Sequence, residues 1–129
     1  MEKDGIFDVQ VKDYIYKVRF ASYNGIQEKD FAEDGEIKML GHCDYIRQLI
    51  RIYGGLSDEK IEYVVRHELT HAYLDTYMSS FKIKDTYDEE DVCCVIATFG
   101  KEITTKAEDV TKQLIEWRNR KYGNFIRNN

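Results

Sequence analysis

Two histidines and a glutamate lie within five residues in the run His67-Glu68-Leu69-Thr70-His71, and these side chains can bind a metal and move a proton. Residues four apart on a helix lie about one turn from each other on the same face, so both imidazoles can reach one divalent ion, expected to be zinc (Zn2+). Glu68 would then lie near the open side of the metal, where its carboxylate can accept a proton from a bound water. The chain has only three histidines, so a chance match is rare. The run therefore predicts a zinc site.

A catalytic zinc needs a third protein ligand. The best candidates are acids in the run from 88 to 94, because a glutamate on an antiparallel second helix can meet the two histidines. His42, upstream of the motif, is a weaker choice. The same acids would also suit the first turn of a helix without any metal.

The order of a strand, a helix with His-Glu-x-x-His and a glutamate on the next helix resembles the gluzincin metallopeptidases, including compact ImmA/IrrE-like and phage-encoded members. The resemblance covers about residues 45 to 100. The thermolysin-like pattern implies Glu90 as the ligand and places Cys94 where those enzymes carry an aspartate. The ImmA/IrrE pattern implies Glu89 instead, with Val92 at a small apolar position. The resemblance thus makes Glu90 the preferred ligand and Glu89 the alternative.

Metzincins are excluded by pattern, because Leu74 and Tyr77 stand where that family carries a glycine and a third histidine. The gluzincin resemblance implies a zinc-dependent metallopeptidase with Glu68 as general base, acting inside the cell on a specific protein, often a repressor. A phenol such as that of Tyr77 or Tyr87 could donate a hydrogen bond in the transition state.

Two other functions stay open on the same residues. One is a catalytically silent zinc-binding module with a regulatory or interaction role, which the small size and Cys94 favour. The other is a different zinc hydrolase, such as an amidase or deamidase. The expected partner is a peptide or protein substrate, and the oligomeric state is unknown.

The first half of the chain has the period of strands. Apolar residues alternate from Phe7 to Phe20, and their parity switches at Lys12-Asp13, which predicts a hairpin turn or a bulge. A further strand is expected from Tyr45 to Tyr53, with Ile46, Ile50 and Ile52 on one face and Arg47 and Arg51 on an exposed face or sheet edge. A substrate peptide would add along that strand.

The second half has the period of helices. Ser57 is the expected N-cap of a helix from about Asp58 to Tyr73 or slightly beyond. A second helix is expected from Asp88 to Phe99, with Gly100 breaking or kinking it before a third. The inward residues expected on these three helices are Ile61, Val65, Leu69, Ala72, Val92, Val95, Ile96, Ile103, Ala107, Val110, Leu114 and Trp117. The whole is an α+β fold, in which a small antiparallel or mixed N-terminal sheet precedes the motif helix and two further helices.

Composition sets the outer limits of function. A length of 129 residues fits a single zincin-like domain over residues 1–129, and a net charge of −5 argues against nucleic-acid binding. No apolar run reaches a membrane span and the N-terminus lacks a signal pattern, so a cytoplasmic protein is expected. Three cysteines, Cys43, Cys93 and Cys94, suit reduced thiols, and the adjacent pair is expected in the core.

Overall fold

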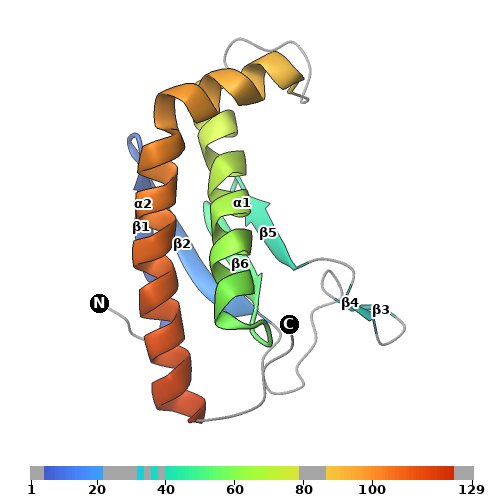
Figure 1. The fold of residues 1–129 in the computed structure, drawn as a ribbon, viewed down its shortest axis with the longest axis vertical. Coiled ribbons are helices and arrows are strands. Elements are labelled where there is room, and N and C mark those ends of the chain that lie inside the picture. Colours follow the sequence, from blue (N-terminus) through green and yellow to red (C-terminus); the bar gives the residue numbers. More distant parts are fainter. Residues whose placement is uncertain (1–4, 22–31, 34–35, 38–39, 79–86, 124–129) are drawn as a thin grey trace.

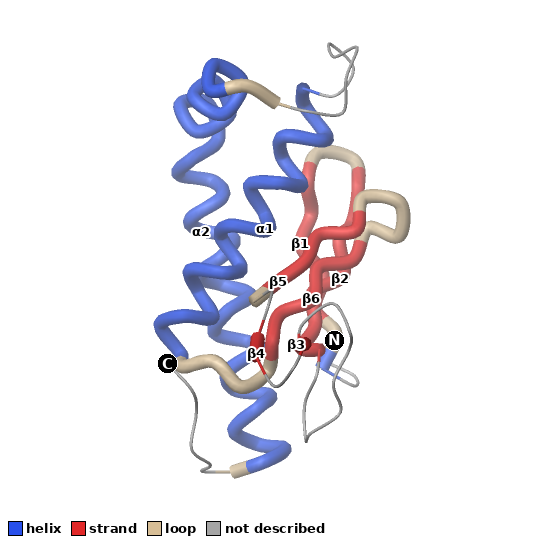
Figure 2. The backbone as a smooth tube through the Cα atoms, turned by 90° about the vertical axis from the view of Figure 1, so that its right-hand side faces the viewer, coloured by secondary structure: helices blue, strands red, loops and turns tan. Residues whose placement is uncertain are grey.

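The computed structural model describes residues 5–21, 32–33, 36–37, 40–78 and 87–123, which form a small sheet followed by two helices. Figure 2 shows the helices in one layer and the four-stranded sheet in the other. The short strands β3 (Ala32–Glu33) and β4 (Glu36–Ile37) pair separately, away from that sheet. The predicted α+β fold, with the sheet first and the motif helix after it, is confirmed.

The predicted N-terminal hairpin is also confirmed. Strand β1 (Phe7–Val11) pairs antiparallel with β2 (Tyr14–Ala21), and Val11 lies opposite Tyr14 across the turn. Lys12 in that turn has a positive φ of 58°, a conformation typical of tight hairpin connections. Because alternate residues of β1 are buried, one face of the hairpin packs against the helices.

Two shorter strands complete the sheet in the order β1-β2-β6-β5. Strand β6 (Leu49–Tyr53) runs parallel to β2, and β5 (Gly41–Asp44) runs antiparallel to β6. Ile50 and Ile52 of β6 are fully buried. Since β6 is paired on both sides, the prediction that Arg51 lies on an exposed face or a sheet edge was wrong, and Arg51 is half-buried. Arg47 is exposed, as predicted, but it lies in the turn before β6.

The predicted strand from Tyr45 to Tyr53 was too long, because residues 45–48 form a turn between β5 and β6. The Asp44 carboxylate accepts hydrogen bonds from the backbone N–H groups of Ile46 and Arg47, at 3.1 and 3.0 Å. This local bonding competes with strand pairing. Ile46 is consequently 95% exposed and does not share the buried face of Ile50 and Ile52 as predicted.

Helix α1 (Asp58–Met78) carries the histidine motif and is longer than predicted. The Ser57 hydroxyl accepts a hydrogen bond from the Lys60 N–H at 3.3 Å, which confirms the predicted N-cap. All four predicted core positions of this helix are fully buried: Ile61, Val65, Leu69 and Ala72. The stripe faces the sheet and α2, so the opposite side of α1 carries the exposed His67.

Helix α2 (Glu89–Tyr122) continues through Gly100 as one helix, so the predicted break into two helices was wrong, whereas the alternative of a kinked helix agrees with its change of direction in Figure 1. Figure 1 shows that α2 changes direction near its beginning, so that its first turns lie across the end of α1. Four predicted core positions, Ile103, Ala107, Val110 and Leu114, are buried, whereas Trp117 is only partly buried.

The first turns of α2 differ from the prediction. Val95 is buried, but Val92 and Ile96 are 37% and 47% exposed because this part of the helix extends past the main sheet layer. Cys93 and Cys94 are also exposed, so their predicted place in the core was wrong. The third cysteine, Cys43, is partly buried and packs against the core.

A buried arginine joins the end of α2 to the beginning of α1. The Arg118 guanidinium is fully buried and donates to the backbone carbonyls of Gly54 and Leu56 at 2.9 and 2.7 Å. It also donates to the Asp58 carboxylate at 2.7 Å and lies over the Phe20 ring. Residues 54–58 lead from the sheet into α1, so Arg118 helps to fix where the motif helix starts.

Candidate metal centre

The two motif histidines lie side by side on α1, as their spacing predicts. Their ring centroids are 5.0 Å apart, with 68° between the ring planes. His67 is exposed and His71 is partly buried, so the pair opens toward solvent. Burial, with help from the positive charge that His67 and His42 can carry, lowers the pKa of His71. This favours the neutral imidazole, which is the form that binds a metal.

Glu68 lies beside the histidines but points toward the sheet. Its side chain is only 6% exposed, and burial raises the pKa of the carboxyl to about 7. A carboxyl with that pKa can both accept and release a proton near neutral pH. The sequence predicted that Glu68 belongs to the site. It did not predict that a strand buries the side chain.

That strand is β5, and its first residue contacts Glu68. A Cβ atom built on Gly41 would lie 3.1 Å from Glu68 Oε2 and 2.5 Å from Val64 Cγ1. Only glycine allows so close an approach of strand and helix. Gly41 therefore brings the sheet edge directly against the general base candidate, a role that the sequence pattern around it did not indicate.

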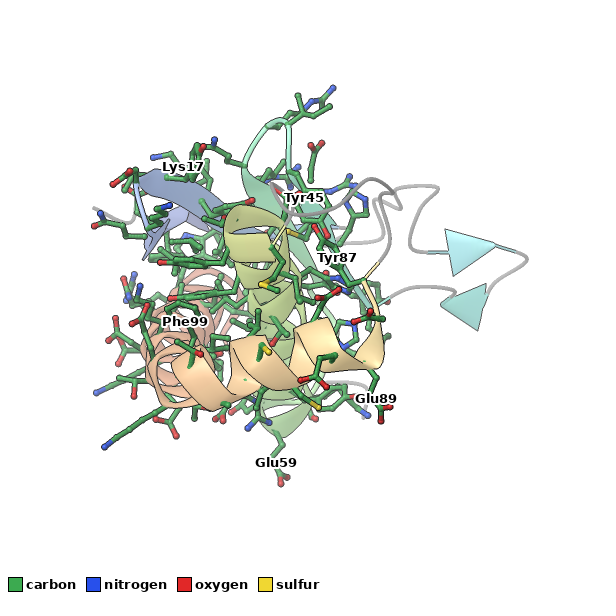
Figure 3. The ribbon with its side chains drawn as sticks, turned by 90° about the horizontal axis from the view of Figure 1, so that it is seen from above. Lys17, Tyr45, Glu59, Tyr87, Glu89 and Phe99 are labelled. Carbon is green, nitrogen blue, oxygen red and sulfur yellow. The ribbon has the colours of Figure 1, made fainter. Side chains whose placement is uncertain are left out.

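The same side of α1 gathers further polar groups that the sequence reasoning missed. Cys43 lies within electrostatic range of Glu68 and Asp75, and burial raises the pKa of its thiol well above the usual range. Burial, followed by the charges of Cys43, Tyr87, Asp75 and Glu68, likewise raises the pKa of Tyr45. Figure 3 shows Tyr45 and Tyr87 near each other beside α1. Asp75 was detectable in the sequence, because it stands two turns after Glu68 on one helix face.

The two acids predicted as third ligand do not lie with the histidines as a group. Glu89 and Glu90 are both exposed on the first turn of α2, and Glu90 Oε2 lies 3.9 Å from Cys94 Sγ. Figure 3 shows Glu89 at the beginning of α2, the part of this helix that crosses α1. Within residues 5–21, 32–33, 36–37, 40–78 and 87–123, no three His, Cys, Asp or Glu side chains converge as a metal-binding group.

The other acids of this turn have a structural role. Asp88 accepts from the Asp91 N–H at 2.9 Å, and Asp91 accepts from the Asp88 N–H at 3.1 Å, which is a complete capping box. The reading of the acidic run as a helix cap is thus confirmed for these two residues. It leaves Glu89 and Glu90 as the acids of the run available to a metal.

His42, the weaker ligand candidate, lies on β5. Its Nδ1 atom is 3.1 Å from Arg51 Nη2 on the neighbouring strand, and the two residues are cross-strand partners. Arg51 can only donate, so Nδ1 is the acceptor in this contact. This contact occupies one of the two ring nitrogens of His42.

The two tyrosines proposed for the transition state lie in different surroundings. Tyr77 stacks on Phe99, with ring centroids 4.2 Å apart, and on Tyr73 at 5.8 Å. Tyr87 is partly buried against the core and lies within electrostatic range of Tyr45, on the side of Glu68. Of the two, Tyr87 is the one that shares surroundings with the general base candidate.

The edge of the sheet beside the motif is β5, not the strand expected from the sequence. β6 has β2 on one side and β5 on the other, so it cannot pair with a peptide. The prediction that a substrate adds along residues 45–53 was therefore wrong. In the described part of the chain β5 pairs with β6 alone, and it is the strand that contacts Glu68.

Comparisons of the chain with protein-family models, with curated proteins and with solved structures gave no match. Neither of the described helices combines the length and the apolar composition needed to cross a membrane.

Proposed function

We propose that this protein is a zinc-dependent metallopeptidase in which His67 and His71 bind the metal and Glu68 is the general base. The observation that carries the proposal is the pair of imidazoles 5.0 Å apart beside a buried glutamate whose pKa is about 7. Two neutral imidazoles on adjacent helical turns fit zinc, which prefers nitrogen, sulfur and oxygen donors in a tetrahedral set.

When bound, zinc supplies Lewis-acid chemistry, polarising a peptide carbonyl and lowering the pKa of water. Glu68 accepts the proton of the attacking water and passes it to the leaving amine, which a carboxyl with a pKa of about 7 can do in both directions. Its burial under Gly41 keeps bulk water away from the carboxylate. In this proposal Tyr87 is the better candidate of the two tyrosines to donate to the developing oxyanion.

A peptide substrate would pair with the outer edge of β5. Backbone N–H and C=O groups on a sheet edge are a template for strand addition. The edge begins at Gly41, which contacts Glu68, so a peptide bound there passes next to the base. This proposal transfers the expected substrate strand from residues 45–53 to residues 41–44.

We propose Glu90 as the third zinc ligand, with Glu89 as the alternative. Both are exposed on the turn of α2 that lies across α1, and adjacent helical residues point about 100° apart, so only one can face the histidines. Zinc affinities of Glu90→Gln and Glu89→Gln distinguish the two candidates. The variant that lacks the true ligand should bind zinc at least tenfold more weakly than the wild type, and the other variant should bind it equally well.

The test of the function compares three variants on metal content and on cleavage of quenched fluorogenic peptide mixtures. Glu68→Gln should keep stoichiometric zinc and lose about 100-fold or more in cleavage rate, because general-base catalysis contributes about 10²–10⁴-fold. His71→Ala should lose the zinc itself. Glu59→Gln, an exposed acid on the same helix, is the matched control and should change neither. Undiminished cleavage by Glu68→Gln would sink the mechanism.

A catalytically silent zinc-binding module with a regulatory or interaction role is the second candidate. The observation that favours it is the close cover over Glu68, which Gly41 leaves only 6% exposed. In that case the wild type would bind zinc with both histidines but cleave no member of a diverse peptide mixture. Stoichiometric zinc without cleavage would decide for this candidate.

We further propose that the protein works in the cytoplasm. All three cysteines, Cys43, Cys93 and Cys94, are free thiols, and two of them are exposed. Exposed thiols persist in a reducing compartment.

A further inference from the structure

The side of α1 that carries the histidines has a continuous row of contacting side chains. The Lys60 ammonium lies 5.7 Å from the centre of the Tyr63 ring, and that ring lies 6.3 Å from the His67 ring. The His67 ring in turn lies 5.0 Å from the ring of His71. We call these four residues the α1 row. Because Lys60 and His67 are seven residues apart, they point only about 20° apart around the helix.

Lys60 is the cation of this row, and its charge is not balanced by an acid of the chain. In the ranges that the structure describes, no carboxylate forms an ion pair with Lys60, although the chain has 24 acidic residues. By contrast, Lys17 and Lys106 each pair with a carboxylate, at 2.6 and 3.2 Å. The half-buried Lys60 side chain can therefore pair with an anionic group of a ligand.

Strand β5 runs along α1 in the same direction as the helix. Its first residue, Gly41, lies against Val64 and Glu68. Two residues further along, Cys43 lies within electrostatic range of Glu68 and of Asp75, which is later in α1. A peptide paired with the outer edge of β5 would therefore also run along α1, rather than across it.

The α1 row lies outside the edge of the sheet. The fully buried Leu69 and the exposed His67 each point about 100° from Glu68 around the helix, in opposite directions. Glu68 faces Gly41 on β5, which is the last strand of the sheet. The direction of Leu69 thus leads into the core, and the direction of His67 leads beyond the sheet edge. A peptide on that edge would lie beside the row.

The spacing of the row suits an extended peptide. At a rise of about 1.5 Å per residue, Lys60 lies about 10.5 Å from His67 along the helix axis. A strand advances about 3.4 Å per residue, so the same distance corresponds to about three residues of a bound peptide. An acidic side chain two or three positions from the peptide bond next to His67 would therefore reach the Lys60 ammonium.

We propose that the α1 row is the recognition surface of the site and that it selects peptides with an acidic side chain, whose carboxylate binds the Lys60 ammonium. This inference rests on the proposed function, because it takes the substrate along β5 and past His67. The Tyr63 ring contacts both Lys60 and His67, and its face attracts the ammonium and holds it in the row. The ion pair then sets the position of the peptide relative to Glu68.

The test is a binding measurement on zinc-loaded Glu68→Gln, which should hold a peptide without cleaving it. Short fluorescein-labelled alanine-valine peptides, amidated at the C-terminus, carry a glutamate at each position in turn, and the glutamine peptides are the controls. Fluorescence anisotropy gives each Kd. Glutamate two or three positions from the bond should bind about fivefold more tightly than glutamine, the upper end for an ion pair open to solvent.

Exchange of the charge at Lys60 distinguishes recognition from a structural role. In the same Glu68→Gln background, Lys60→Met removes the charge, so glutamate and glutamine peptides should bind equally well. Lys60→Glu should reverse the preference, so that a lysine at the selected peptide position binds more tightly than a glutamate. A purely structural role of Lys60 would not reverse it. Lys112→Met, which removes an exposed lysine of α2, is the matched control and should keep the glutamate preference.

Failure of this inference and failure of the proposed function give different results. If acidic peptides are preferred in binding but the wild type cleaves none, the recognition surface stands and the peptidase function fails. If the wild type cleaves peptides but Lys60→Glu keeps the glutamate preference, the function stands and the inference is overturned. An absence of peptide binding also overturns the inference, as does a gain in affinity that comes only from a free C-terminal carboxylate.

Discussion

Replacing the buried Arg118 by methionine should destabilise the fold by about 3–5 kcal/mol, because two buried backbone carbonyls lose hydrogen bonds from a charged donor. Methionine keeps most of the volume against the Phe20 ring, so the loss comes from the polar contacts. The carbonyls of Gly54 and Leu56 lose donors at 2.9 and 2.7 Å, and each hydrogen bond from a charged group contributes about 1.5–3 kcal/mol.

The contact of Arg118 with Asp58 should matter much less. Although it is 2.7 Å long, the Asp58 side chain is 51% exposed, and an ion pair open to solvent contributes about 1 kcal/mol or less. Asp58→Asn should therefore cost at most about 1 kcal/mol, while Arg118→Met costs several times more. The difference identifies the two backbone carbonyls, rather than the ion pair, as the important partners.

Urea unfolding followed by far-ultraviolet circular dichroism measures both free energies of unfolding. Arg120→Met is the matched control, because Arg120 is exposed two residues further along α2, and it should change stability by less than about 0.5 kcal/mol. The reasoning is refuted if Arg118→Met costs less than about 1 kcal/mol, or if Asp58→Asn costs as much as Arg118→Met.

Three other predictions follow from buried and exposed groups. The hydroxyl of the fully buried Tyr73 donates to the Glu102 carboxylate and lowers its pKa, so Tyr73→Phe should cost about 1 kcal/mol at neutral pH. Because the pKa of Glu102 is lower in the folded chain than the unfolded value of 4.5, the ionised carboxylate stabilises the fold above pH 4.5, and this stabilisation is lost as the pH falls through the folded pKa. The difference in unfolding free energy between the wild type and Tyr73→Phe should therefore shrink in acid, and a difference that stays constant with pH would contradict the prediction. Iodoacetamide should modify the exposed Cys93 well before Cys43, because burial keeps the Cys43 thiol protonated. Equal rates of modification in peptide mass spectrometry would disprove this prediction. Ile46→Ser should change the free energy of unfolding by less than about 0.5 kcal/mol, because Ile46 is 95% exposed; a loss above about 2 kcal/mol would place it in the core.

Elements with a sustained period were predictable from the sequence. The alternation from Phe7 to Phe20 gave the hairpin because one face of β1 and β2 is buried under the helices. The stripe of α1 and its Ser57 cap gave the motif helix for the same reason, since burial and capping are both encoded within a few residues. Such local signals fix where an element lies and which face it buries.

Elements decided by contacts across the fold were not predictable in this way. Val92 and Ile96 have the spacing of core residues, yet they are exposed because the beginning of α2 passes beyond the sheet. Gly100 lowers helix propensity by about 1 kcal/mol, but the helix continues through it because Phe99 and Ile103 on either side pack against the core. In both places tertiary packing, rather than local preference, determines the outcome.

The candidate site also has a part that local sequence predicts and a part that depends on contacts across the fold. His67 and His71 belong to one helix, so their separation follows from helical geometry alone, and the structure places their rings 5.0 Å apart. The third ligand has to come from another element, whose direction the sequence does not specify. The capping box narrows the choice of third ligand, because the Asp88 and Asp91 carboxylates each accept a hydrogen bond from the other residue's backbone N–H. Glu89 and Glu90 are left exposed on the same turn. Glu89 and Glu90 are adjacent on the helix and point about 100° apart, so the direction in which this turn packs decides which of them is nearer the histidines. The spacing of the two proposed ligands on α1 therefore follows from the sequence pattern, whereas the choice of glutamate depends on how the beginning of α2 packs across α1.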